Sequence, residues 1–397
     1  MLDRRSDAAI GSVDAPIVPS ARIFTTCDVT HLMVILHLRR HLQRPPAREF
    51  LIWHPLAASL DRIMSMIAPE AGFDGMLDMR DFASLKPRTQ HAVAWWFEAP
   101  RRLREDAAKL HGWMAANGID EARAELWAAD PFHFNVTLPR AALRHSIHVK
   151  TPHCFNFEDA MTRELKGRFE ADWRNRSVAK RHVYYPWLRW SAGVDMRIDR
   201  IVYDRAYTFA APSPWSANSV DASALISMDA FAATYDGLPM RLRSEVEALL
   251  APIRAGAKPL VLLLLFGLGD DDGFRSVYQR ALTRIFTEQA RELCDCTLAV
   301  KWHPGANGGQ ERLLVEWMRA NLPARIHEID HPLNLEFMLP QLQPDYVVAG
   351  LCGSLPIVRD LRAGRPIILA EWLDLYLAEW PGEADSVRQF LRGIEIW

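Results

Sequence analysis

Between residues 260 and 369 the chain alternates short apolar runs with longer amphipathic runs, and this alternation constrains the fold more than any other feature. A short run rich in Val, Leu and Ile predicts a buried strand, and an apolar residue every three or four positions predicts a helix. Strands that alternate with helices predict a parallel sheet with helices on both faces. The expected strands are 260–266, 297–302, 325–328, 346–349 and 366–369, and the helices are 274–292, 309–321, 334–339 and 355–363.

The first half of the chain repeats this alternation less clearly. A chain of 397 residues that is 49% hydrophobic can bury more than one core. We predict a flexible segment over 1–20, a first Rossmann-like domain over 21–250, and a second Rossmann-like domain with a C-terminal helix over 258–397. A helix over 238–250 closes the first domain, and a linker over 251–258 follows it. Within the first domain we expect strands 21–27, 50–53, 125–129 and 147–150 and helices 31–42, 57–67 and 92–117.

Composition limits the partners and the compartment. The 47 Lys and Arg residues nearly balance the 49 Asp and Glu residues, so no global field attracts nucleic acid. Five scattered cysteines predict neither a disulfide framework nor a zinc site, and they fit a reducing compartment. The N-terminal residues lack the apolar run of a signal peptide, and the longest apolar run, 259–267, is too short to span a membrane. The expected location is the cytoplasm, with peripheral attachment at the inner membrane left open.

Residues suited to nucleotide binding follow the expected strands of the second domain. Lys301 and His303 come at the end of the strand 297–302, and Ser354 lies in a turn before a helix. Ligands of open parallel sheets bind at the carboxyl ends of the strands, and the start of a helix offers N–H groups to phosphate. A His-Pro pair alone says little, because the chain contains three. The order of His303, Glu336 and Ser354 therefore carries the prediction of a nucleotide site.

A glycine-rich acidic loop follows the first strand of the second domain. Residues 267–273 read Gly-Leu-Gly-Asp-Asp-Asp-Gly. The spacing of Asp270 and Asp272 resembles the metal-binding acids of GT-A transferases, but its place at the start of a second nucleotide-binding domain argues against that class. We expect Gly267 and Gly269 to let the backbone approach the nucleotide. An ordinary surface turn is the alternative.

Several of these motifs occur together in one known family. In their order they resemble the donor-binding domain of bacterial GT-B sialyltransferases and capsule polysialyltransferases. That family also carries an acidic pair in its first domain, which matches Glu158 and Asp159 here. The resemblance implies the GT-B fold, in which two Rossmann-like parallel-sheet domains face a central cleft, with the acceptor side in 21–250 and the nucleotide-sugar donor bound by 258–397. The matching segments are 301–304 (Lys-Trp-His-Pro), 331–336 (His-Pro-Leu-Asn-Leu-Glu), 344–350 (Pro-Asp-Tyr-Val-Val-Ala-Gly) and 353–354 (Gly-Ser).

The resemblance also implies roles for single residues. Glu158, with Asp159 beside it, is the catalytic base that deprotonates the acceptor hydroxyl. His303 binds the phosphate of the donor and assists the departure of CMP. Glu336 accepts the ribose hydroxyls, and Ser354 binds phosphate. Further donor contacts come from Lys301, Pro304, Gly353, Gly267 and Gly269. The donor is CMP-sialic acid, and the scheme requires no metal and no other cofactor.

Alternatives stay open for most of these residues. Ala160 and Gly353 replace the Gly and the first Ser of the family pattern. The acidic pair also fits the first turn of a helix. Glu336 also fits an exposed helix position, and Ser354 an ordinary helix cap. The alternative catalytic bases, from the second domain, are Asp271 and Asp272.

A basic and aromatic stretch over 163–190 suggests how an acceptor is held. Arg174, Arg176, Lys180 and Arg181 are expected to bind a polyanionic acceptor or the anionic face of a membrane. A solvated helical face is the alternative.

The resemblance thus predicts an inverting, metal-independent transferase that moves sialic acid from CMP-sialic acid to a hydroxyl of a capsule or lipooligosaccharide type of glycan. One alternative is a related GT-B transferase that uses CMP-Kdo or another nucleotide sugar. The other is a catalytically inactive GT-B-like protein that binds a glycan. The acceptor, the linkage and the oligomeric state are not predicted.

Overall fold

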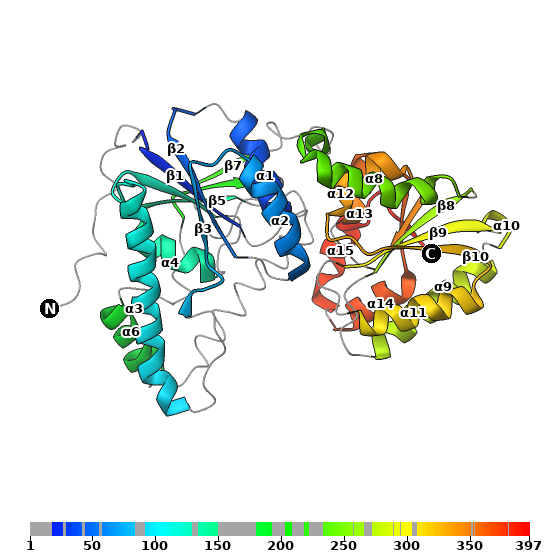
Figure 1. Cartoon of the computed structure of the whole chain (residues 1–397). Coiled ribbons are helices and arrows are strands. Elements are labelled where there is room, and N and C mark those ends of the chain that lie inside the picture. Colours follow the sequence, from blue (N-terminus) through cyan, green and yellow to red (C-terminus); the bar gives the residue numbers. More distant parts are fainter. Residues whose placement is uncertain are drawn as a thin grey trace.

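The structure is a computed structural model, and it contains two parallel β-sheets, each with helices on both faces (Figure 1). It describes residues 18–26, 29–41, 44–54, 58–83, 92–128, 134–149, 180–192, 203–208, 218–221, 233–256, 258–265, 272–288, 290–293, 295–303, 308–350, 352, 354–379 and 381–397. Within these ranges, none of the helices combines the length and the apolar character needed to cross a lipid bilayer.

The first sheet has seven strands in the order β3-β2-β1-β4-β5-β6-β7, and neighbouring strands run parallel. Strand β1, in the interior of this sheet, is buried along its whole length, as the apolar run in the sequence predicts. The strands are β1 (Ala21–Thr26), β2 (Arg48–Trp53), β3 (Gly75–Asp78), β4 (Ala124–Ala128), β5 (His145–Val149), β6 (Arg205–Thr208) and β7 (Ser219–Asp221).

Alternate residues of each strand face opposite helix layers. Phe24 of β1 joins the core cluster made with α1 (Val29–His41) and α2 (Ala58–Glu70). Ile23 joins the cluster on the opposite face, made with α3 (Ala92–Ala116) and α4 (Phe134–Ala142). A π-helical turn, η2 (Lys180–Tyr184), leads into α6 (Tyr185–Ala192), which packs against α3.

The second sheet has six parallel strands in the order β10-β9-β8-β11-β12-β13. Counted along the chain this is the order 3-2-1-4-5-6, which is the strand order of Rossmann dinucleotide-binding sheets. The strands are β8 (Leu260–Leu264), β9 (Cys296–Lys301), β10 (Ala324–Ile329), β11 (Tyr346–Ala349), β12 (Arg365–Ile368) and β13 (Glu395–Ile396).

Helices cover both faces of the second sheet as well. Leu260, Leu262 and Leu264 face the core shared with one helix layer, while Val261 and Leu263 face the other. The first layer contains α8 (Met240–Arg254), α12 (Leu335–Leu342), α13 (Ser354–Asp360) and α15 (Ala384–Phe390). The second contains α9 (Asp272–Glu288), α11 (Gly309–Asn321) and α14 (Ala370–Glu379). The short helices are η4 (Ala233–Gly237), α10 (Ala290–Leu293) and η5 (Pro381–Glu383).

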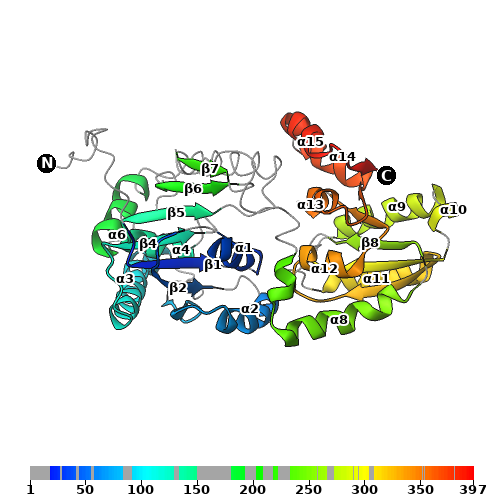
Figure 2. The same cartoon turned by 90° about the horizontal axis from the view of Figure 1, so that it is seen from above.

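Helix α8 brings the carboxyl ends of both sheets to the same region. Its first half meets the first domain, because Glu245 forms an ion pair with Arg62 of α2, with 2.5 Å between Oε2 and Nη2. Since β8 begins beyond the far end of α8, the strand runs back toward the first domain (Figure 2). Helix α2 in turn begins soon after the carboxyl end of β2. Two Rossmann-like sheets arranged in this way confirm the predicted GT-B fold class.

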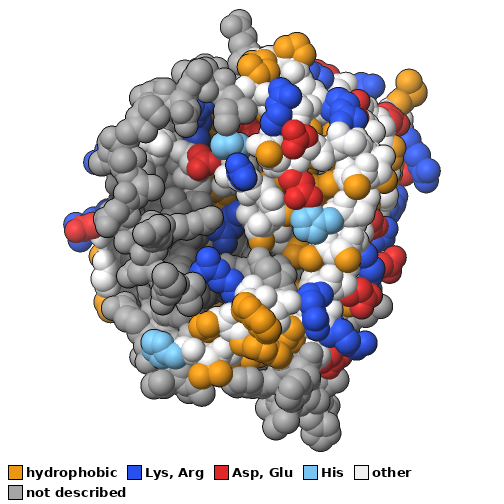
Figure 3. All heavy atoms as spheres, turned by 90° about the vertical axis from the view of Figure 1, so that its left-hand side faces the viewer, with side chains coloured by type: hydrophobic (Ala, Val, Ile, Leu, Met, Phe, Trp, Pro, Cys, Tyr) orange, Lys and Arg blue, Asp and Glu red, His pale blue; other side chains and the backbone are white. Residues whose placement is uncertain are grey.

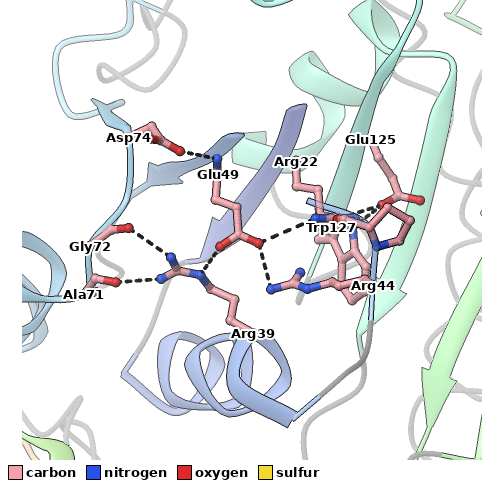
Figure 4. A network of polar contacts seen from close by, with 10 residues as sticks. Arg22, Arg39, Arg44, Glu49, Ala71, Gly72, Asp74, Glu125 and Trp127 are labelled. Carbon is pink, nitrogen blue, oxygen red and sulfur yellow. Dashed lines mark hydrogen bonds and ion pairs between the residues drawn. The ribbon is translucent and has the colours of Figure 1, made fainter. Parts of the chain in front are cut away.

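The amino-terminal edge of the first sheet is held by a cluster of charged residues, which we call the amino-edge charge cluster (Figure 4). The carboxylate of Glu49 lies 2.6 Å from Arg39 Nε, 2.7 Å from Arg44 Nη2 and 3.8 Å from Arg22 Nη1. Arg22 Nε lies 3.6 Å from Glu125 Oε2. Three guanidinium groups are thus packed around two carboxylates, and burial lowers the pKa of Arg44.

One predicted boundary needs correction. Residues 251–254 are helical rather than a linker, and α8 continues through Pro252 to Arg254. The last turn is held by tertiary contacts, because Ile253 is buried and Arg254 Nη1 donates to the carbonyl of Gln341 (3.2 Å). Near the C-terminus, helices α14 and α15 are followed by the short edge strand β13. The strands that sequence analysis missed, β3, β6, β7 and β13, are two to four residues long, too short to show a period.

Candidate functional site

The order of strands in the second sheet reverses between β8 and β11, and ligands of open parallel sheets bind at the carboxyl end of such a point. The last residues of these strands, Leu264 and Ala349, are paired. On the other side of β8, Leu264 pairs with Lys301, the last residue of β9. Lys301 and His303 therefore lie at the edge where the sequence places them.

An aromatic wall stands beside this point, and sequence analysis missed it. A Cβ atom on Gly350, just after β11, would come within 2.9 Å of Trp372 Cγ, so the indole approaches the bare backbone. The Trp372 ring stacks on Phe274, with 5.3 Å between ring centroids and 4° between planes. It also contacts Tyr278, whose hydroxyl donates to the carbonyl of Leu264 (3.1 Å). The only signal of this wall in the sequence is that one aromatic residue, Phe274, follows β8 and another, Trp372, follows β12.

Lys301 ties the ends of two neighbouring strands together. The side chain is buried, and Nζ donates to the carbonyl of Trp302 (2.9 Å) and to that of His331 (2.7 Å), which follows β10. Two of the three ammonium hydrogens of Lys301 thus form hydrogen bonds with backbone carbonyls. This arrangement fixes the ends of β9 and β10 relative to each other.

His331 is buried at the same edge, with a defined tautomer. Its Nδ1 accepts a hydrogen bond from the backbone N–H of Leu333 (3.1 Å), so the neutral ring carries its proton on Nε2. The described part of the chain offers this buried Nε2 no hydrogen-bond partner. Burial, followed by the charges of Lys301 and Arg62, lowers the pKa of His331 to about 4. The ring is therefore a neutral donor at pH 7.

His303 is the exposed imidazole of the edge. Its pKa is lowered, first by the protein atoms that displace water around it and then by the charge of Lys301. Glu311, buried in the first turn of α11, opposes this shift. Neutral His303 is thus the dominant form at pH 7 in the free protein.

Trp302 completes what we call the carboxyl-edge cluster, which consists of Lys301, Trp302, His303 and His331. The indole is buried, and its Nε1 has no hydrogen-bond partner among the described residues. It packs close to Gly308, whose φ of 85° begins α11 in the left-handed region that favours glycine. Both buried rings of the cluster therefore carry N–H groups that the described protein does not satisfy.

The structure describes only some of the other predicted site residues. Ser354 is the half-buried first residue of α13, as expected for a residue at a helix start. Glu336 lies in the first turn of α12 and Asp272 begins α9, but their side chains are not among the described ones. Lys180 and Arg181 lie in η2. The predictions that fall outside the described residues concern Glu158, Asp159, Ala160, Arg174, Arg176, Gly267, Gly269, Asp271, Pro304 and Gly353.

Helix α6, which continues directly from η2, lies with α3 on the side of the first sheet away from the second sheet (Figures 1 and 2). Lys180 and Arg181 are thus not at the carboxyl edges of the sheets. A cavity of about 470 Å³ also lies elsewhere, at the amino edge of the second sheet, where Pro344 and Gly364 precede β11 and β12. Neither feature belongs to the carboxyl-edge cluster.

No protein-family model matches the chain, and no curated protein sequence matches it. Among solved structures, the chain is similar to UDP-GlcNAc 2-epimerase from Neisseria meningitidis bound to UDP-GlcNAc (TM-score 0.44, 12% identity, 88% of this chain and 81% of that chain). It is also similar to Os79 from O. sativa in complex with UDP (TM-score 0.44, 11% identity, 88% and 81%). A third is the trehalose-6-phosphate structure from E. coli with UDP-2-fluoro glucose (TM-score 0.42, 10% identity, 88% and 84%). The TM-scores and sequence identities are low, so these structures assign no function to the chain.

Proposed function

We propose that the protein is a GT-B glycosyltransferase that binds a nucleotide-sugar donor at the carboxyl edge of the second sheet. The observation that carries this proposal is the position of the carboxyl-edge cluster, next to the strand-order reversal and on the side of the sheet that faces the first domain. The acceptor then enters from the first domain.

The edge suits an anionic ligand with many oxygen atoms. His331 Nε2 and Trp302 Nε1 are buried N–H groups without acceptors among the described residues, and each such group costs about 1–3 kcal/mol when left unsatisfied. His303 adds an exposed ring at the same edge. A phosphate placed beside His303 raises its pKa by charge attraction, opposite to the shift in the free protein. Donor binding and proton uptake by His303 are therefore coupled.

The reaction needs one group that takes a proton and one that stabilises the leaving phosphate. Glu158 is the proposed base, with Asp271 and Asp272 as alternatives. As the acceptor O–H bond breaks, its oxygen forms a bond to the anomeric carbon from the side opposite the phosphate. The bond between that carbon and the phosphate oxygen breaks, and its electron pair stays on the nucleotide. His303 donates a hydrogen bond or its proton to that oxygen.

The proposed donor is CMP-sialic acid, and the motif order 301–304, 331–336 and 353–354 supports it. Another nucleotide sugar, such as CMP-Kdo or a UDP-sugar, fits the same edge. Calorimetric titration of the full chain with CMP, CMP-sialic acid and UDP separates these cases. Binding of CMP and not UDP supports the sialyl or Kdo donor. Binding of UDP alone rejects the CMP-sugar and keeps the transferase, whereas binding of no nucleotide at millimolar concentration removes the proposal altogether.

Variants then locate the base. Glu158→Gln is expected to abolish formation of free CMP from donor and acceptor, detected by mass spectrometry, while CMP affinity stays unchanged because the base contacts the acceptor. Asp271→Asn and Asp272→Asn are the matched comparisons, since they also neutralise one carboxylate each. An active Glu158→Gln protein together with an inactive Asp271→Asn or Asp272→Asn protein places the base in the second domain.

A further inference from the structure

The segment formed by η2 and α6 carries a second apolar stripe, with exposed side chains at both of its ends. Tyr184 and Leu188 point inward and are buried where α6 and η2 meet the first domain. Trp190, in contrast, is 84% exposed and Val183 is 57% exposed. Half-buried Trp187 lies between them at a spacing of four and three residues, so the three side chains follow one line along the helix surface. One face therefore packs, and the other presents two large apolar groups to solvent.

This pairing is unusual among the described residues. The other exposed large apolar side chains among the described residues lie on four different elements and, for one of them, just before β1, and single exposed apolar residues need no explanation. They are Val18, Met240, Leu313, Leu375 and Ile396. Trp190 is the most exposed large apolar side chain among the described residues, and a stripe that contains it does need an explanation.

The same segment is strongly basic. Residues 180–192 contain Lys180, Arg181, His182 and Arg189 and no Asp or Glu, in a chain whose formal net charge is −2. In the view onto this end of the molecule, apolar side chains gather on the lower part of the described surface with Lys and Arg side chains beside them (Figure 3). Basic residues and exposed apolar residues thus occur together in the short segment formed by η2 and α6.

We propose that the surface formed by η2 and α6 docks the protein onto an anionic lipid surface. Tryptophan prefers the boundary between lipid headgroups and acyl chains, and Lys and Arg are attracted to anionic headgroups at the same depth. A nucleic acid or a polyanionic glycan accounts for the charges and for stacking on Trp190, but it leaves the aliphatic side chain of Val183 in water. A second copy of the chain is disfavoured, because one short helical stripe buries far less area than a stable dimer needs. Docking here also leaves the carboxyl edges of both sheets open (Figure 2).

The test is sedimentation of the full chain with vesicles of phosphatidylcholine, with and without phosphatidylglycerol. The protein is expected to sediment with the anionic vesicles, and 0.5 M salt is expected to weaken this binding because the attraction is screened, the Debye length falling to about 4 Å. The double change Val183→Ser and Trp190→Ser is expected to weaken the partition at least about tenfold, since it removes the inserted apolar groups. Met240→Ser changes an equally exposed apolar residue on α8 and is expected to have no effect.

Three results overturn the proposal. In the first, the unchanged protein does not sediment with anionic vesicles. In the second, the double variant binds them as well as the unchanged protein, or the Met240→Ser control loses binding to the same extent. In the third, the double change converts a dimer to a monomer in analytical ultracentrifugation without altering vesicle binding, which assigns the stripe to a second copy. Thermal unfolding of the double variant is expected to match the unchanged protein, because both side chains are exposed.

Discussion

The two polar clusters of the molecule differ in what their charged and ring groups contact. In the amino-edge charge cluster, Arg22, Arg39 and Arg44 all lie within ion-pair distance of the Glu49 carboxylate. In the carboxyl-edge cluster, Lys301 donates to backbone carbonyls, and the ring N–H groups of Trp302 and His331 have no partner in the described part of the chain. In the first cluster each guanidinium lies within ion-pair distance of a carboxylate, although Arg22 Nε and Arg44 Nη1 form no hydrogen bond in the described part of the chain. The unused donors of the second cluster belong to neutral rings at the carboxyl edge of a parallel sheet, which is where such sheets bind ligands.

The largest effect is expected from Glu49→Ala in the amino-edge charge cluster. Removing this carboxylate leaves the guanidinium groups of Arg39 and Arg44 without their closest counter-ion in a mostly buried place. Breaking a buried ion pair from one side typically costs about 3–5 kcal/mol of unfolding free energy. Urea unfolding of the purified protein measures the loss.

The control for Glu49→Ala is Glu105→Ala, which removes an exposed carboxylate paired with Lys109 on α3. This change is expected to cost no more than about 0.5 kcal/mol, because exposed pairs on a helix are weak. Equal losses in both variants contradict the view that the amino-edge charge cluster is a structural centre. Nucleotide affinity of the folded Glu49→Ala protein is expected to stay unchanged, which separates stability from binding.

The pH dependence of stability tests the buried imidazole of the carboxyl-edge cluster. The pKa of His331 is lowered to about 4 in the folded protein, whereas the ordinary value is 6.5. The unfolded chain therefore binds a proton more readily, and stability falls as the pH falls from about 6.5 to about 4. At about 1.4 kcal/mol for each unit of pKa, this residue contributes up to about 3 kcal/mol across that window. Urea unfolding at pH 7.0, 5.5 and 4.5 measures the slope.

His331→Asn isolates this contribution, because the Asn side-chain oxygen can replace Nδ1 as the acceptor for the Leu333 N–H but does not titrate. The variant is expected to lose less stability on acidification than the unchanged protein. The pKa values of His303 and His327 are also lowered, so these residues make both proteins less stable on acidification. Subtracting the pH dependence of the variant from that of the unchanged protein cancels their contribution. Identical slopes show that His331 does not titrate as its surroundings predict.

Gly350→Ala tests the close approach of the aromatic wall to β11. The new Cβ atom would lie 2.9 Å from Trp372 Cγ, so the indole and the rings stacked on it must shift. Overpacking of this kind typically costs about 1–3 kcal/mol. The variant is also expected to bind nucleotide more weakly, because the wall lies beside the strand-order reversal. Gly382→Ala is the matched control, since a Cβ atom there meets nothing within 4 Å. A nucleotide affinity that survives a destabilising Gly350→Ala change removes the wall from the site.

Sequence analysis located the carboxyl edge but not the contacts that characterise it. Strands β8 and β9 are fully buried apolar runs, so their ends, and with them His303, were visible in the sequence. The aromatic wall joins Phe274 to Trp372, which are far apart in sequence and meet only in the folded sheet. His331 belongs to the motif 331–336, but the sequence assigns it no role, because a His-Pro pair carries no information about burial or tautomer. The proposed base, Glu158, lies outside the described residues and stays a prediction.

The smallest effect on stability is expected at His303, the exposed member of the carboxyl-edge cluster. His303→Ala is expected to change the unfolding free energy by no more than about 0.5 kcal/mol, because exposed side chains contribute little. It is expected to weaken CMP binding about 10-fold to 100-fold in calorimetry, the size of one lost hydrogen bond to a charged group. His111→Ala on α3 changes another exposed histidine and is expected to leave CMP affinity unchanged. If His303→Ala instead destabilises the protein and spares CMP binding, the carboxyl-edge cluster is structural, and the contrast with the amino-edge charge cluster is lost.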